Sequence, residues 1–175
     1  RGRRGGALVL LRPRRVLSPR FSYPSRELPP FAAFEIDLPD GWEAREAPDC
    51  LGIFVAPGVE GFRVNLIVGA DRVSADFDLE DAAAATLEQS RAAFGELRVE
   101  QEKVAVIAGR PAALRMQSFA VEGLDDRLLQ LQVLLFAPPG DRTATKDLFH
   151  IDGTCLDADR AIYAPVFAAA AESFR

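Results

Sequence analysis

The sequence predicts an α+β fold in which one antiparallel β-sheet is flanked by two main helices. Apolar residues recur with period two over residues 31–73 and 97–155, as they do in half-buried strands. Over residues 78–94 and 157–174 the apolar residues instead recur with the period of a helix. Short turns rich in Gly, Pro and Asp separate the strand-like segments, which favours antiparallel neighbours. The predicted order is three strands, a helix, four strands and a second helix.

Three strand-like segments precede the first helix. Apolar and acidic side chains alternate over Phe34–Leu38, and Pro39-Asp40-Gly41 then turns the chain towards Trp42, which we expect to close one end of the core. Residues 51–55 form the second predicted strand and residues 62–68 the third.

The first helix is predicted to begin after Asp76 or Asp78, because either side chain can cap the first free amides. We expect Gly95 to end this helix. Its expected buried stripe consists of Leu79, Ala83, Leu87, Ala93 and Phe94.

Four strands are predicted between the helices, over 97–107, 112–121, 127–136 and 146–155. The inward-facing phase of the first of them changes part-way, so we expect a bulge near Gln101–Lys103. The last helix opens near Asp157. Because Pro165 lacks an amide hydrogen and clashes with the preceding turn, we expect a short first turn and a restart with Pro165 near its first position.

Charge is distributed unevenly along the 175 residues. Residues 1–20 contain seven arginines and no acid, and removing these charges from the net charge of −5 leaves −12. An acidic body argues against nucleic-acid binding by the folded part. We therefore predict a basic, flexible N-terminal segment over residues 1–28 and a single domain over residues 29–175.

No integral membrane segment is expected, because the longest early apolar run, Ala7–Leu11, has only five residues. Neither a signal peptide nor a lipid-attachment cysteine is visible, which favours a cytoplasmic location. The sequence starts with Arg1 rather than Met, so export stays open.

The motifs together resemble the PsbP-like superfamily, in particular its bacterial branch of LpqN/LpqT-type lipoproteins, DcrB-like proteins and Eag-type secretion chaperones. The resemblance rests on the order of Phe34–Trp42, Asn65–Val68, Ala108–Pro111, Ala164–Phe167 and Glu172–Phe174. It implies an α/β/α sandwich and a non-enzymatic role in binding partners. The lipoprotein members carry an attachment cysteine near their start, which is not seen here.

We expect no enzyme activity, no cofactor and no metal site. His150 is the only histidine and stands in a predicted strand, with no nucleophile motif nearby. The two cysteines, Cys50 and Cys155, have no metal-ligand spacing. A disulfide between them requires Cα atoms within about 7 Å, which the sequence leaves open.

One sheet face remains as a candidate partner-binding surface. In the strand 127–136 the alternate residues Leu129, Leu131, Val133 and Leu135 are all apolar, while the set from Leu128 to Phe136 is apolar with two glutamines at its centre. Neighbouring strands can add further polar groups to this second face. The candidate partner-binding residues are Arg63, Asn65, Arg115, Gln117, Phe119, Gln130, Gln132 and Leu134.

Such a face suits a groove for a peptide or an apolar helix, or it is covered by the other helix or by a homodimer partner. Our hypothesis is a non-catalytic protein-binding module, with an adaptor or secretion-associated chaperone that holds an apolar segment as its specific form. The alternative is a carrier of a small ligand or lipid, with a pocket between sheet and helix.

Overall fold

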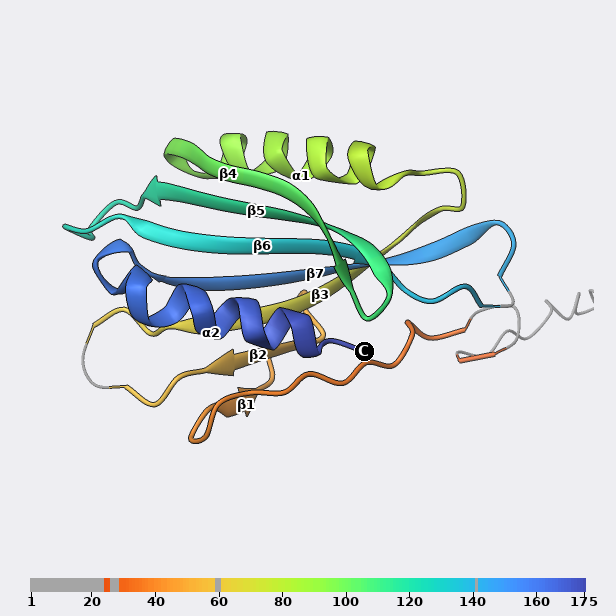
Figure 1. Ribbon diagram of the computed structural model, residues 1–175, viewed down its shortest axis with the longest axis horizontal. Helices are drawn as coiled ribbons and strands as arrows, with labels where there is room; N and C mark the ends of the chain where they lie inside the picture. Colours follow the sequence, from red (N-terminus) through yellow and green to blue (C-terminus); the bar gives the residue numbers. More distant parts are fainter. Residues whose placement is uncertain (1–23, 26–28, 59–60, 141) are drawn as a thin grey trace, which may run out of the picture. The chain divides into compact units, whose positions relative to one another are not determined.

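A seven-stranded antiparallel sheet forms the centre of the fold, with strand order β1-β2-β3-β7-β6-β5-β4 (Figure 1). The last strand in the sequence is thus the middle strand of the sheet, where it pairs with β3 and β6. The elements are β1 (Glu43–Arg45), β2 (Gly52–Val55), β3 (Asn65–Ser74), α1 (Leu79–Ala93), β4 (Gly95–Ile107), β5 (Arg110–Ala120), β6 (Leu128–Phe136), β7 (Thr145–Leu156), a 3-10 turn (Asp157–Asp159) and α2 (Arg160–Ser173).

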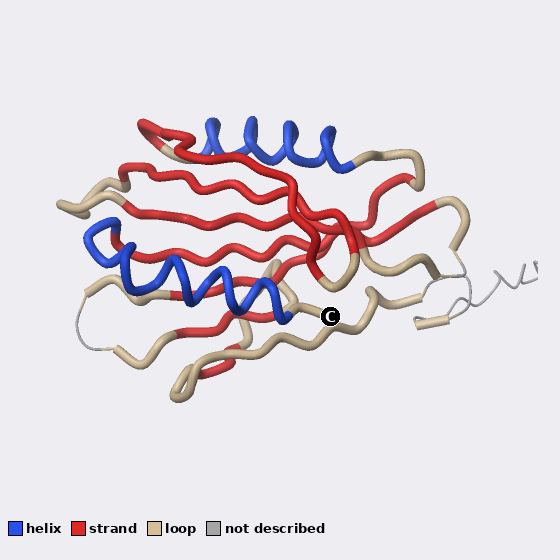
Figure 2. Tube along the Cα trace, in the orientation of Figure 1, coloured by secondary structure: helices blue, strands red, loops and turns tan. Residues whose placement is uncertain are grey.

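This computed structural model describes residues 24–25, 29–58, 61–140 and 142–175. Phe31–Arg175 form one compact unit. Most of the predicted basic segment, residues 1–28, lies outside the described residues. The predicted class and element order are confirmed: one antiparallel sheet carries two main helices, as the tube in Figure 2 shows.

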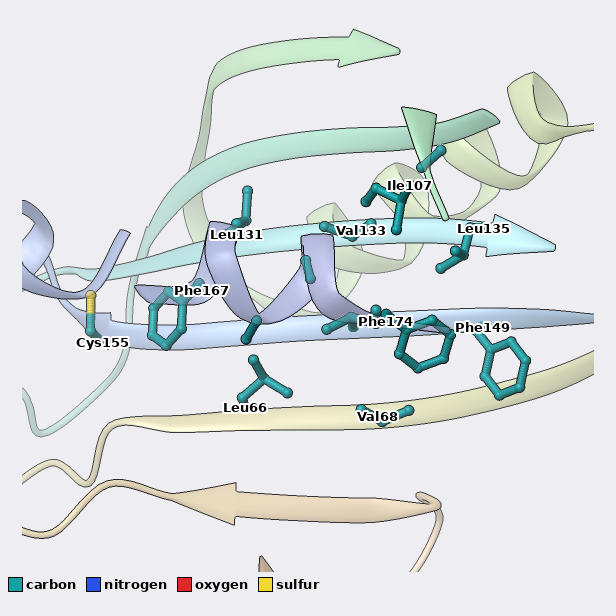
Figure 3. Packing of buried hydrophobic residues seen from close by; sticks show 14 of the residues in the cluster. Leu66, Val68, Ile107, Leu131, Val133, Leu135, Phe149, Cys155, Phe167 and Phe174 are labelled. Carbon is teal, nitrogen blue, oxygen red and sulfur yellow. The ribbon is translucent and has the colours of Figure 1, made fainter. Parts of the chain in front are cut away.

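Helix α2 covers the apolar face of the sheet. Phe167, Phe174 and the small residues between them pack on alternate residues of β3, β5, β6 and β7, including Leu66, Val133 and Phe149 (Figure 3). All five of these side chains are almost completely buried. Burial of an apolar side chain of this size contributes about 1.5–3 kcal/mol, so this layer is the main hydrophobic core.

Gly153 of β7 permits the close approach of α2. A Cβ atom built at this position would lie 2.3 Å from Cγ of Phe167. The ring therefore rests directly on the backbone of the central strand. The Trp42 indole meets the same ring edge-to-face, with centroids 6.5 Å apart, so Trp42 packs on this core next to the turn where it was predicted.

The first predicted strand is wrong. Residues 34–38 are extended but pair with no strand, and β1 instead begins at Glu43. Glu35 N donates to Arg175 O at 2.8 Å, and Arg175 N donates back to Glu35 O at 3.1 Å. The alternation reflects real burial, since Phe34 stacks on Phe174 with centroids 5.2 Å apart. Its backbone partner is the end of α2 rather than the sheet.

A buried carboxylate holds the start of this extended segment. Asp147 of β7 accepts hydrogen bonds from Ala32 N at 2.9 Å, Arg72 Nε at 3.2 Å and Arg142 Nη1 at 2.7 Å. Burial acts to raise its pKa, but the hydrogen bonds from Arg142, Ala32 and Arg72 together hold the pKa below its ordinary value. The charge is thereby paired as a buried charge must be.

Helix α2 is continuous through Pro165, contrary to the predicted restart. The predicted short first turn is present as the 3-10 turn, but the helix already begins at Arg160. Ala161 and Pro165 are both exposed, so water can satisfy the carbonyl that a proline at position i+4 leaves free.

Helix α1 begins after Asp78, whose Oδ1 accepts a hydrogen bond from Asp81 N at 2.8 Å. It ends with Phe94 in an extended conformation, and the predicted terminator Gly95 is instead the first residue of β4. The predicted stripe is also displaced, because the buried residues are Ala82, Thr86 and Ser90. Ser90 Oγ meets Gln117 Nε2 of the sheet at 3.4 Å, whereas the Thr86 hydroxyl donates to the Ala82 carbonyl of its own helix.

The strand β4 has the irregularity that the change of phase predicted, slightly earlier than expected. Its pairing with β5 shifts between Gly95 and Arg98 and again between Val99 and Gln101, and is regular afterwards.

Cys50 and Cys155 are free thiols, and burial is the main cause that raises the pKa of Cys155 to about 11.

Replacement of Gly153 by Ala should lower the free energy of unfolding by about 2–4 kcal/mol, because the new methyl group overlaps the Phe167 ring. Urea denaturation monitored by circular dichroism measures the change. Gly69→Ala on β3 is the control, since no heavy atom lies within 4 Å of a Cβ at that position. Equal stability of Gly153→Ala and the wild type would contradict this account of the packing.

Candidate binding groove beside helix α1

The strand register collects most of the predicted binding residues on the sheet face beneath α1. Two rows cross the sheet there. The first is Asn65, Thr154, Gln130 and Gln117, and the second is Ile67, Asp152, Gln132, Arg115 and Glu102. Side chains opposite one another in such rows are close enough to interact.

The first row forms a chain of amide and hydroxyl contacts. Gln117 Nε2 donates to Gln130 Oε1 at 2.7 Å and lies 3.4 Å from Ser90 Oγ of α1. Gln130 Nε2 lies 3.4 Å from Thr154 Oγ1. Gln117 is 0% exposed, and its Oε1 has no hydrogen-bond partner among the described residues. Gln117 is thus the residue of this row that contacts α1, through Ser90.

Arg115 is the centre of the second row and is only 4% exposed. Its Nε donates to Glu102 Oε1 of β4 at 2.7 Å, and its Nη1 donates to Gln132 Oε1 of β6 at 2.8 Å. Its Nη2 donates to the Ala83 carbonyl of α1 at 2.6 Å. One guanidinium on β5 therefore joins three neighbouring elements.

Helix α1 covers five of the eight predicted binding residues. Phe119 stacks on Phe94 with centroids 3.9 Å apart, and Leu134 packs against Ala82. The open apolar face is thus mostly a helix-packing surface, which was the alternative left open by the sequence. The five covered residues are Arg115, Gln117, Phe119, Gln132 and Leu134.

Arg63 is not brought to this surface. It is exposed and precedes β3, where its carbonyl accepts a hydrogen bond from Asn65 Nδ2 at 2.9 Å. Its charge, more weakly than that of Arg45, lowers the pKa of Glu43 on β1. Arg63 therefore lies near the opposite edge of the sheet from β5.

A groove of about 500 Å³ lies between the N-terminal part of α1 and strands β4, β5 and β6. Arg115 and Gln132 contribute polar groups to it, and Glu80 and Glu102 add acidic ones. Lys103 adds a basic group, and the remaining lining is apolar: Leu79, Ala83, Val104, Ala113, Leu114 and Leu134.

The apolar surface continues out of the groove along β4. Val104 is 74% exposed and Val106 is 72% exposed. Glu102 and Val104 lie opposite Arg115 and Ala113 on β5, so residues 102, 104 and 106 point to the α1 side. Neither valine is among the predicted binding residues, although both stand in the predicted strand 97–107.

A second, polar hollow lies on the other side of α1, over β7 and β3. His150 Nε2 lies 2.9 Å from Asp71 Oδ2, and Asp152 is two residues further along the same face. Asp152 retains some exposed surface, but its Oδ1 is buried and has no hydrogen-bond partner among the described residues. Burial raises the pKa of Asp152 to about 6, against the opposing effects of Gln132, His150 and Arg115.

These groups do not assemble a hydrolytic triad. No hydroxyl hydrogen bond to His150 is found within the described ranges, and no group of three or more metal-ligating residues is found there. In the same part of the chain, no helix is long and apolar enough to cross a membrane.

No known protein family profile and no curated protein sequence matches this chain. Three solved structures share its architecture. LpqN of Mycobacterium tuberculosis, described as involved in cell envelope biogenesis, superposes with a TM-score of 0.65 at 15% identity, covering 81% of each chain. Cyanobacterial PsbP of Synechocystis superposes with a TM-score of 0.56 at 15% identity, over 81% of this chain and 85% of that one.

The chain has a PsbP-like fold. Protein PA94 of Pseudomonas aeruginosa, of unknown function, also shares it, with a TM-score of 0.58 and 18% identity over 81% of this chain and 96% of the other. At these identities the PsbP-like likeness concerns architecture, and the order of motifs from Phe34 to Phe174 correctly predicted it.

Replacement of Arg115 by Met should lower the free energy of unfolding by about 3 kcal/mol, because Gln132, Glu102 and the Ala83 carbonyl lose their shared donor. Chemical denaturation measures the loss. Arg91→Met removes an exposed ion pair on α1 and should cost less than about 1 kcal/mol. Similar values for the two variants would show that Arg115 does not join these elements.

Asp152 should make the fold less stable as the pH rises from about 4 to about 6. Its pKa is raised in the folded protein, so the folded state holds more protons than the unfolded state in this window. The free energy of unfolding should fall by up to about 3 kcal/mol and stay lower above pH 6. Asp152→Asn should remove this decline, measured as the difference between the two pH profiles.

Asp125→Asn in an exposed turn is the matched control and should leave the profile unchanged. A wild-type profile that coincides with that of Asp152→Asn across the window would contradict the raised pKa.

Proposed function

We propose that this chain is a non-catalytic protein-binding module that holds an apolar segment of a partner in the groove beside α1. An adaptor or a secretion-associated chaperone is the specific form of this proposal. The observation that carries it is the continuity of the groove with Val104 and Val106, which leaves a band of apolar surface open to solvent. Exposed apolar bands of this kind are typical of interaction sites.

The polar groups of the groove favour an uncharged, apolar occupant. Arg115 already donates to three acceptors within the protein, and Glu102 already receives one of these bonds. A buried guanidinium with this set of partners has little to gain from the carboxylate of a ligand. Apart from Glu80 and Lys103, the walls that remain for contact are aliphatic.

A non-catalytic role agrees with the chemistry of the polar hollow and with the structures that share the fold. Cys50 lines the same hollow as His150 and Asp71, but its thiol contacts the Ala47 carbonyl at 3.7 Å, and no hydrogen bond joins it to His150 within the described residues. LpqN, which has the same fold, is described by involvement in envelope biogenesis rather than by a reaction. A role in handling other proteins at or near the cell envelope is consistent with that description.

The second candidate is a carrier of a small ligand or lipid. A volume of about 500 Å³ is within the usual range for ligand pockets and favours this alternative. The exposed valines at its rim favour a longer occupant that extends beyond the groove.

Ala83→Trp should fill the groove and weaken binding of a fluorescent apolar peptide rich in leucine and alanine by about tenfold or more. Ala85→Trp, on the exposed side of the same helix, should bind as the wild type does. Fluorescence anisotropy measures both, with a fluorescent long-chain fatty acid as the second probe.

Binding of the fatty acid without the peptide would favour the carrier. If the wild type bound neither probe, or if both variants behaved alike, the groove would not be the binding site.

A further inference from the structure

The two edges of the sheet are protected very differently. The β1 edge has three exposed residues, and Glu43 and Arg45 form an ion pair with atoms 2.9 Å apart. Short, charged edge strands of this kind resist pairing with other chains. The other edge is β4, which has thirteen residues and ends the sheet.

The second half of β4 is a regular edge with free backbone groups on its outer side. Gln101 to Ile107 pair with β5 without a register shift. Across the described ranges, no backbone hydrogen bond joins these seven residues to any segment other than β5. An unpaired row of amides and carbonyls is a template for an added strand.

The side chains of this edge favour such pairing. Val104 and Val106 are more than 70% exposed, although valine is among the residues that pair best across strands. Glu102 and Lys103 are the second and third of the seven regular residues. From Val104 to Ile107 the edge lacks the charge, proline or bulge that usually blocks strand addition.

An added strand would place alternate side chains next to the groove. Val104 lines the groove and points to the α1 side, so a residue opposite it on an added strand would also lie on that side. Side chains on neighbouring strands reach about 5–8 Å across a sheet face, which brings a long apolar side chain to the groove mouth. Charges of both signs line the groove, because Lys103 and Arg115 accompany Glu80 and Glu102, so the apolar side chains are the main basis for recognition.

We propose that an extended segment of a protein partner, with alternating apolar side chains, adds to the outer edge of β4. This inference rests on the proposed function and specifies how its partner is recognised. The seven regular residues span about 23 Å, which suits a short segment. A second copy of this chain suits the edge less well, because a stable dimer buries about 800 Å² on each partner. The rest of β4 could not extend the contact, since it is bulged and carries Glu96, Arg98 and Glu100.

The probe is a blocked, fluorescent peptide of alternating valine and threonine with lysine at each end, and binding is measured by fluorescence anisotropy. The double variant Val104→Lys and Val106→Lys should bind it at least about tenfold more weakly. Ile162→Lys on α2 is the matched control, because this residue is also apolar and 63% exposed. It should bind as the wild type does.

A second peptide with the same side chains and N-methylated alternate amides tests the backbone directly. Strand addition requires its amide donors, so its affinity should fall about tenfold or more.

Equal affinity for the methylated and parent peptides would overturn strand addition. If the apolar peptide rich in leucine and alanine then still bound in an Ala83-dependent manner, the proposed function would stand without this mode of recognition. If sedimentation showed a wild-type dimer that the double lysine variant dissociates, the edge would be occupied by a second copy, which also overturns the proposal.

Discussion

The contact between Gly153 and Phe167 is the constraint on which the main core depends. The ring lies where a Cβ atom would otherwise stand, so α2 can approach the central strand closely. From that position α2 brings Phe174 onto Phe149, and its last residues hold the extended segment around Glu35. A larger residue in β7 would displace the helix and with it both ends of the compact unit. Close packing of this kind leaves little room for adjustment.

The two faces of the sheet are stabilised by different interactions, apolar burial on one and hydrogen bonds on the other. The α2 face is aliphatic and aromatic, and its stability comes from burial. The α1 face uses Arg115 and the amide row to meet a helix whose buried side contains Thr86 and Ser90. Hydrogen bonds are directional, so they specify where α1 lies but fill space less completely than aliphatic packing. The groove at the N-terminal part of α1 is consistent with this difference.

The groove and the exposed edge of β4 belong to one surface. The irregular pairing of β4 is confined to its first part. The regular part pairs with β5 on one side, and its Val104 and Val106 are exposed beside the groove. A strand added at this surface, as we propose, would combine side-chain contacts with main-chain hydrogen bonds. Such sites recognise the pattern of a partner segment more than any single residue in it.

The sequence by itself determined the class, the element order and the PsbP-like resemblance, because periodicity and turn residues act locally. Tertiary structure decided which segments pair: residues around Phe34 alternate as a strand would, yet their partner is Arg175, far away in the chain. It also decided that α1 covers the face around Gln117. Exposure depends on contacts between distant segments, so the groove and the open valines of β4 could not be found from local pattern alone.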